Sequence, residues 1–242
     1  MSKKIAAFFD IDGTLYREGL ITEVFKKLIK SEIIENSRWY NEVRPYYIKW
    51  DRRQGNYDNY LLKMADIYTE AIKGLHQSQV DFIADLVIKQ KGDRVYTYTR
   101  DSIKYHKDNG HLVIAISGSP IELVTYMSRK YGFTDFIGSV YEIDHNNKYT
   151  GNIRPMWDSS NKQKAIAYFC EKYGIDLSKS FAYGDTSGDF TMLKSVGNPV
   201  TINPTKELLS KIMDCSEIKE KIKIIVERKD VVYNLKPENI EF

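Results

Sequence analysis

Short apolar runs alternate along this chain with longer stretches in which apolar residues recur at helical spacing. This alternation is typical of an α/β fold, in which parallel strands are joined by crossover helices. The runs expected to form strands are 5–10, 111–117, 135–141, 179–185 and 198–203, and segment 145–152 has the composition of a turn between two short strands. We therefore predict an α/β core built on a parallel sheet.

The region between the first two runs has a different pattern. Apolar residues recur there with the period of amphipathic helices: Ile21, Val24, Phe25, Leu28 and Ile29, then Leu61, Met64, Ala65, Tyr68 and Ile72, then Val80, Ile83, Ala84 and Val87. We predict a helical insert over 17–91, with 1–16 and 92–242 forming the α/β core. Because the insert directly follows the first strand, it is placed to cover the end of that strand.

Composition narrows the class of protein. A chain of 242 residues with 42% hydrophobic content can form one elaborated domain or a core with an inserted subdomain. Cys170 and Cys215 have no metal-like spacing and are expected to be reduced thiols. The net charge of +3 is spread along the chain, so no nucleic-acid partner is expected.

The first residues resemble neither a signal peptide nor a membrane span, which favours a cytoplasmic protein without a membrane partner. The sequence does not indicate an oligomeric state.

Two carboxylates stand at the end of the first apolar run. Asp10 and Asp12 are separated by one residue and are followed at once by Gly13 and Thr14. Two such charges repel each other by roughly 1 kcal/mol in water and by several kcal/mol in a drier cleft. A divalent cation, a proton held by one of the pair, or exposure to water would each offset this repulsion.

Small polar residues follow the second run. Ligands of an open parallel sheet bind beyond the carboxyl ends of its strands, where Ser117, Gly118 and Ser119 are expected. Ser119 as N-cap, with Pro120 and Glu122 behind it, predicts a capping-box start to the next helix. The free amides of that helix would then bind an anion together with the Ser117 hydroxyl and the Gly118 amide. The same residues also suit an ordinary turn between a strand and a helix.

Two more acids follow the fourth run. Asp185 comes directly after Gly184, and Asp189 follows one helical turn later. Together with Asp10 and Asp12 they would place up to four carboxylates at one end of the sheet, which destabilises a fold that holds no balancing cation. Hard oxygen ligands without histidine or cysteine nearby in sequence select Mg²⁺.

If the anion bound here is a phosphate, a positive side chain is also needed to balance its charge. Lys162 and Lys164 lie at the start of an amphipathic helix and either could serve, although lysines on a helix most often face solvent.

These stretches occur in a characteristic order: Asp10-x-Asp12-Gly13-Thr14, then Ser117, then a lysine, then Gly184-Asp185-x-x-x-Asp189. In this order the sequence resembles the haloacid dehalogenase (HAD) superfamily of phosphohydrolases, specifically its phosphoserine-phosphatase-like branch, subclass IB, over nearly the whole chain. The resemblance implies a Rossmann-like α/β core with an inserted helical cap of type C1. The lysine spacing of that branch selects Lys162 over Lys164.

The resemblance also implies a mechanism. Asp10 would attack phosphorus and form an aspartyl-phosphate, while Asp12 would protonate the leaving oxygen and later activate water. Mg²⁺ would be held by Asp10, the Asp12 carbonyl and Asp185, with Asp189 orienting another of its ligands. Catalysis would also need Ser117 and Lys162, and the phosphate-binding residues would be Asp10, Thr14, Ser117, Gly118 and Lys162. The implied activity is Mg²⁺-dependent hydrolysis of a small phosphomonoester.

The predicted cap departs from the phosphoserine phosphatases. Those enzymes carry a glutamate where this chain has Gly19, with Glu18 one position too early, and an arginine-rich motif in the cap for the amino acid. Here segment 37–57 is rich in both aromatic residues and arginine. It is either the core of the cap with exposed guanidinium groups or a pocket for a flat or anionic leaving group. Phosphoserine is therefore not the expected substrate.

Three other functions use similar residues. A phosphotransferase or mutase of the same superfamily would differ only in its product. A receiver-like phospho-switch shares the acids, the hydroxyl and the lysine, but it lacks both the Asp-x-Asp-Gly-Thr order and a long insert after the first strand. A binding protein without activity is disfavoured because every chemical position is filled.

Overall fold

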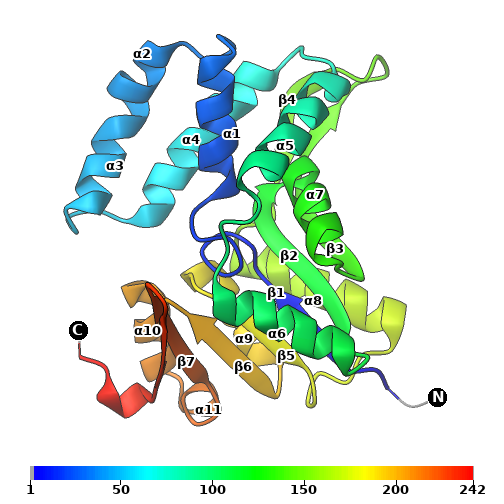
Figure 1. Cartoon of the computed structure of the whole chain (residues 1–242), viewed down its shortest axis with the longest axis vertical. Coiled ribbons are helices and arrows are strands. Elements are labelled where there is room, and N and C mark those ends of the chain that lie inside the picture. The colour runs from blue at the N-terminus through cyan, green and yellow to red at the C-terminus, as the bar shows by residue number, and fades with distance from the viewer. Residues whose placement is uncertain (1–2, 242) are drawn as a thin grey trace.

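The computed structural model describes residues 3–241, the side chain of Asp58 excepted, and its centre is a twisted, mostly parallel sheet (Figure 1). The described strands follow the order β4-β3-β2-β1-β5-β6-β7-β8, in which only β4 and β8, at the two edges, are antiparallel to their neighbours. Their bounds are β1 Ala6–Phe9, β2 Leu112–Pro120, β3 Asp135–Ile143, β4 Tyr149–Arg154, β5 Phe181–Gly184, β6 Asn198–Ile202, β7 Lys223–Arg228 and β8 Val231–Leu235. All five predicted strands are confirmed, and so is the turn that joins β3 to β4.

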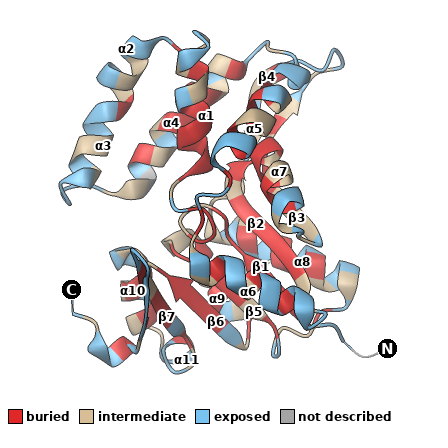
Figure 2. Ribbon diagram, viewed as in Figure 1, coloured by how far each residue is buried: buried red, intermediate tan, exposed pale blue. Residues whose placement is uncertain are grey.

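The central strands are buried on both faces, as Figure 2 shows. In β1, Ala6 and Phe8 pack into one hydrophobic cluster, whereas Ala7 and Phe9 pack into a second cluster on the other side. This division follows from the alternation of side chains along a strand. It explains why the strand reads as a continuous apolar run.

Helices cover the two faces of the sheet. α6 (Thr97–Asp108) and α7 (Ile121–Tyr131) pack on the face of Phe9. The opposite face is covered by α8 (Ser159–Tyr173), α9 (Phe190–Ser195), α10 (Lys206–Met213) and α11 (Ser216–Lys219), and two 3-10 turns lie at η2 (Ser187–Asp189) and η3 (Pro237–Asn239). The α/β fold class predicted from the sequence is thus confirmed. No helix among the described residues is both long enough and apolar enough to cross a membrane.

Further helices fall within the predicted insert and lie above the carboxyl end of the sheet (Figure 1). They are α1 (Leu20–Lys30), α2 (Asn36–Arg38), the π-helical turn η1 (Trp39–Val43), α3 (Arg44–Asp51), α4 (Tyr57–Ile72) and α5 (Gln77–Lys91). We call residues 17–91 the helical insert. Aromatic residues of segment 37–57 pack together with Tyr60 of α4: the ring centroid of Tyr47 lies 6.0 Å from that of Trp39, 5.7 Å from that of Trp50 and 5.5 Å from that of Tyr60.

The chain enters and leaves the helical insert at one place. The Arg17 amide donates to the Arg94 carbonyl at 3.0 Å, and the Tyr96 amide donates to the Leu15 carbonyl at 2.9 Å. Glu227 of β7 joins this crossing point, because it accepts hydrogen bonds from the Arg17 guanidinium at 3.0 Å and from two amides at the start of α6. The sheet therefore holds both connecting segments together.

One predicted helix start is wrong. Strand β2 continues to Pro120 and α7 begins at Ile121, so Ser119 is extended and does not cap the helix. Glu122, the other half of the expected capping box, instead accepts a hydrogen bond from the Tyr149 hydroxyl at 2.7 Å. The reason is that the Ser119 hydroxyl has a stronger partner, a carboxylate on the neighbouring strand segment.

Candidate active site

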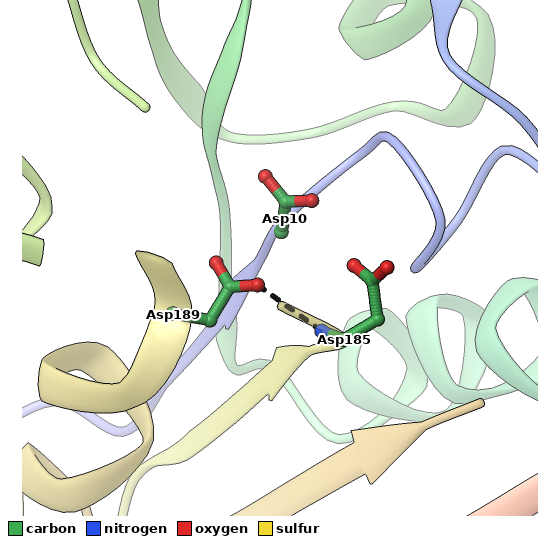
Figure 3. Close-up of side chains that lie close together, drawn as sticks. All are labelled: Asp10, Asp185 and Asp189. Carbon is green, nitrogen blue, oxygen red and sulfur yellow. Dashed lines mark hydrogen bonds between the residues drawn. The ribbon is translucent and has the colours of Figure 1, made fainter. Parts of the chain in front are cut away.

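Three predicted acids meet at the carboxyl ends of β1 and β5. Asp10 follows β1, Asp185 follows β5, and Asp189 ends the turn η2 (Figure 3). One carboxylate oxygen from each lies within 4.8 Å of the others, and all three residues are buried. Sequence segments about 175 residues apart are thus brought together because parallel strands end at the same edge of a sheet.

Lys162 is the cation that reaches these acids. It lies in the first turn of α8, where the Asp158 carboxylate caps the helix by accepting from the Asn161 amide at 2.9 Å. Its ammonium donates to Asp10 Oδ1 at 2.7 Å and to Asp189 Oδ1 at 2.5 Å, and its side chain is only 3% exposed. Burial alone would lower the pKa of Lys162, but the two carboxylates raise it above its usual value. Lys164, the other candidate, is exposed on the same helix.

Asp10 lies in an environment that opposes its negative charge. Burial is the largest effect and, with the nearby charges of Asp189 and Asp12, raises the pKa of Asp10 to about 8 despite the ion pair with Lys162. Burial and the charges of Asp189 and Asp10 likewise raise the pKa of Asp185 well above its usual value. One lysine is therefore too little positive charge for this group of acids.

Asp12 is not part of the cluster of the other three acids and has hydrogen-bond partners of its own. Its Oδ1 accepts a hydrogen bond from the Leu20 amide at the start of α1, at 2.6 Å. Its Oδ2 accepts from the Ser119 hydroxyl at 2.5 Å and, more weakly, from the Ser117 hydroxyl at 3.4 Å. Burial raises the pKa of Asp12 in spite of these donors. Asp12 is thus a carboxyl group held in a fixed orientation, with a greater tendency to carry a proton than an exposed aspartate.

Thr14 contacts an acid in the structure. Its hydroxyl donates to Asp185 Oδ1 at 2.8 Å, and its carbonyl accepts from the Thr99 hydroxyl at 2.8 Å. Gly13 makes this approach possible, since its φ is +77° and a Cβ at this position would collide with the Asp185 carboxylate. These contacts fix the position of Asp185.

Asp189 is fully occupied by neighbouring donors. Its Oδ2 accepts from the Asp185 amide and the Thr186 amide, each at 3.1 Å, while Oδ1 accepts from Lys162. By contrast, Asp10 Oδ2 and Asp185 Oδ2 accept no hydrogen bond from the part of the chain that the structure describes. Asp189 thus has hydrogen-bond donors on both oxygens, whereas Asp10 and Asp185 each have one oxygen that could bind a cation.

The donor set suits a hard divalent cation. The two available oxygens, on Asp10 and Asp185, belong to buried carboxylates whose pKa is raised because positive charge is scarce. Oxygen-only donors of this kind match Mg²⁺ rather than zinc or copper. Asp189 would stand beside such a cation and orient what surrounds it.

Three of the five phosphate-binding candidates, Asp10, Gly118 and Lys162, line a cavity in front of these acids, whereas Thr14 does not line it. Its volume is about 370 Å³, and Asp10, Asp12, Gly118 and Lys162 all contribute to its wall. Ser117, although buried, lies next to this wall, and its hydroxyl oxygen accepts from the Ser119 amide at 3.1 Å. The residues predicted to bind an anion thus lie in the last part of β2 and not at the start of α7.

Several lining residues are not among those predicted from the sequence, and two of them, Ser119 and Trp157, contact predicted site residues. Ser119 was assigned to the helix cap, so its contact with Asp12 was missed. Trp157 precedes the cap of α8 and enters the wall because two glycines leave room for it: a Cβ on Gly118 would lie 2.8 Å from the Trp157 Cβ, and one on Gly188 would collide with the Trp157 carbonyl oxygen. Gly118 and Gly188 belong to motifs that the sequence shows, but the sequence does not indicate that both pack against Trp157.

The chain is similar in sequence and fold to known proteins. The family model of the haloacid dehalogenase-like hydrolases matches residues 7–194. The histidinol-phosphatase of Neisseria meningitidis is 23% identical over 85% of this chain and 93% of its own length. Phosphoserine phosphatase SerB1 of Mycobacterium tuberculosis is 31% identical, but the alignment covers only 49% of this chain and 38% of that protein. A solved structure described as a substrate-bound phosphoserine phosphatase complex shares the fold, with a TM-score of 0.61, 20% identity and coverage of 95% of this chain and 96% of that one.

The family match extends over most of the chain and includes all four motif stretches. The chain therefore belongs to the haloacid dehalogenase-like hydrolases. Within them it is an enzyme of the phosphatase type, similar to the phosphoserine phosphatases, as the sequence resemblance predicted.

Proposed function

We propose that the protein is a Mg²⁺-dependent phosphomonoester hydrolase that acts on a small phosphorylated metabolite through an aspartyl-phosphate on Asp10. The observation that carries the proposal is the contrast between two carboxylates of one motif. Asp10 meets Lys162 at the floor of the cavity, whereas Asp12 is turned aside and held by Leu20 and Ser119. One acid is placed to attack phosphorus and the other to carry a proton.

In the first step an oxygen of Asp10 attacks phosphorus, and the bond from phosphorus to the leaving oxygen breaks. Asp12 gives its proton to that oxygen, so the product leaves as an alcohol. In the second step Asp12 removes a proton from water, and the water oxygen replaces Asp10 on phosphorus. The raised pKa of Asp12 suits both transfers, because the group must be protonated before the first step and accept a proton in the second.

The remaining groups neutralise and position the phosphoryl oxygens. The Lys162 ammonium, the Ser117 hydroxyl and the Gly118 amide are the donors that would bind these oxygens. Asp10, the Asp12 carbonyl and Asp185 would hold Mg²⁺, which supplies the positive charge that lets a carboxylate approach a phosphate. Thr14 and Asp189 would keep these ligands in place.

The test is phosphate release from p-nitrophenyl phosphate by the purified protein. Activity with Mg²⁺ that is lost in excess chelator and restored by added Mg²⁺ supports the proposal. Undiminished activity in chelator contradicts the metal assignment. Adding a large excess of a second alcohol distinguishes hydrolysis from phosphotransfer, since a transferase or mutase forms a new phosphate ester whereas a hydrolase releases inorganic phosphate.

A further inference from the structure

The cavity has two walls of different chemistry. The charged wall comes from the core and contains Asp10, Asp12 and Lys162. The wall contributed by the helical insert contains Gly19, Ile21, Tyr57, Leu61, Leu62 and Ala65, and none of these carries a charge. Since the phosphoryl group must lie on the charged wall, the rest of the substrate lies against the insert.

At Gly19 the structure shows what occupies the space of a missing side chain. A Cβ on Gly19 would lie 3.3 Å from Leu61 Cδ2 and 3.5 Å from the Tyr57 hydroxyl oxygen. The neighbouring acid, Glu18, does not line the cavity and instead pairs with Arg94 at 2.7 Å on the surface. A methyl group and the hydroxyls of Tyr57 and Thr22 therefore stand at this point, and none of these three nearest groups is a carboxylate that could bind an ammonium group.

Among the charged residues of the insert whose side chains the structure describes, none lines the cavity. Arg38 pairs with Glu42 at 2.7 Å and with Glu70 at 2.8 Å. On the core side, Asp158 lines the cavity, but both of its oxygens already accept hydrogen bonds from Asn161. Among the described residues, the remaining charged one that lines the cavity is Lys211, an exposed lysine of α10, which repels a cationic group.

We propose that the substrate is the phosphate monoester of an uncharged, largely apolar alcohol, whose carbon skeleton packs against Ile21, Leu61 and Leu62 of the insert and against Trp157 of the core. This inference rests on the proposed function. A buried ammonium without a partner costs far more than a methyl group at the same place, so the walls select by charge as well as by shape. Selection then comes from desolvation and not from a specific ion pair.

A matched set of esters tests the inference. Propyl phosphate and phosphoethanolamine have leaving groups of nearly equal size that differ in one methyl or ammonium group. We expect kcat/KM to be higher for propyl phosphate by about tenfold or more. Along the series from ethyl to hexyl phosphate, whose alcohols have similar acidity, kcat/KM should rise by about twofold to fourfold per methylene until the cavity is filled.

Two variants test whether the cavity wall of the insert causes the dependence of kcat/KM on alkyl chain length. Leu62 lines the cavity and is 41% exposed, and Phe82 on α5 is 66% exposed and does not line it. Leu62→Gln should reduce the preference for hexyl over ethyl phosphate by about threefold or more, whereas Phe82→Gln should leave it unchanged. Their exposure means that both variants should fold, which circular dichroism would verify.

Three results would overturn the inference: phosphoethanolamine hydrolysed as well as propyl phosphate, a flat response along the alkyl series, or equal losses in the two variants. Absence of Mg²⁺-dependent phosphate release from every ester, p-nitrophenyl phosphate included, would instead overturn the proposed function on which the inference rests.

Discussion

The core and the helical insert treat buried charge in opposite ways. The core buries acids and a lysine beneath the sheet edge and connects them to one another, with Lys162 between Asp10 and Asp189. The insert packs the partly buried rings of Trp39 and Tyr47 near the buried ring of Tyr60, and its Arg38–Glu70 ion pair lies at the surface. Under the proposed function, the chemistry and the choice of substrate would have separate physical origins, electrostatic in the core and hydrophobic in the insert.

The largest expected effect is that of Asp10→Asn. An amide cannot attack phosphorus as a carboxylate does, so turnover of p-nitrophenyl phosphate should fall by more than about 10⁴-fold. The fold should be retained, because the substitution removes one of several repelling acids and keeps the size of the side chain. Thermal unfolding measures this, with the exposed Asp101→Asn on α6 as control. Retained activity would move the nucleophile elsewhere.

Asp12→Ala should separate the two chemical steps. p-Nitrophenolate leaves without a proton, so the variant should still transfer phosphate to Asp10, but hydrolysis of the aspartyl-phosphate should slow by roughly 10²–10⁴-fold. Rapid mixing should show a burst of nitrophenol approaching one equivalent per site, followed by a slow phase. If the variant is folded and gives no burst at any Mg²⁺ concentration, the Asp12 side chain is needed to bind the cation and not to carry the proton.

The core also contains a buried histidine that gives stability a pH dependence. His106 lies between the His111 ring and the Tyr183 hydroxyl, at 2.9 Å from each, and burial followed by His111 lowers the pKa of His106 to about 4. Between this pH and about 6.5 the unfolded chain binds a proton that the folded chain does not, so acidification lowers the free energy of unfolding. The single-site contribution is up to roughly 3 kcal/mol and is present above pH 6.5.

Urea unfolding at pH 7, 5 and 4 measures this contribution. His106→Gln should be less sensitive to acid than the wild-type protein, although less stable at pH 7, and His145→Gln in the exposed turn between β3 and β4 should behave like the wild type. Equal pH dependence of the wild type and His106→Gln would show that His106 is not the responsible group.

The smallest expected effect is on the insert side of the comparison. Arg38→Ala removes ion pairs to Glu42 and Glu70 whose side chains are partly exposed, and the expected cost is within about 1 kcal/mol, with kcat/KM unchanged. Lys89→Ala, which breaks the exposed pair with Asp85, is the matched control on α5. A loss of activity on removing Arg38 would mean that the surface charges of the insert also select the substrate.

Much of the site could be predicted because its residues leave strands at known points. Asp10 and Asp185 directly follow β1 and β5, and Ser117 lies near the end of β2, so the parallel sheet brings these positions together whatever the intervening sequence. The insert could be predicted because long amphipathic helices have a strong period. What the sequence patterns show is thus the set of elements and the edge at which their polar residues meet.

Side-chain partners were harder to predict. Ser119 suits a helix cap by local rules, yet its hydroxyl binds Asp12, a residue more than a hundred positions away. Thr14 was expected near the phosphate and contacts Asp185. In both cases a buried carboxylate, whose location depends on the tertiary fold, is the better acceptor. Trp157 lines the cavity and packs against Gly118 and Gly188, which lie in two other segments. No local sequence pattern predicts these contacts.

The crossing point between Leu15 and Tyr96 has a consequence for how such a protein can change over evolutionary time. Because the chain leaves the core and returns through neighbouring, hydrogen-bonded segments, an insert of different length or sequence can be exchanged there without spanning any gap in the core. The β3–β4 hairpin sets a limit on this exchange, since the Gly74 amide donates to the Tyr149 carbonyl and the Tyr149 amide donates to the Leu75 carbonyl. An insert taken from another protein would therefore be expected to need its own β3–β4 hairpin, so the insert and this hairpin would be exchanged together.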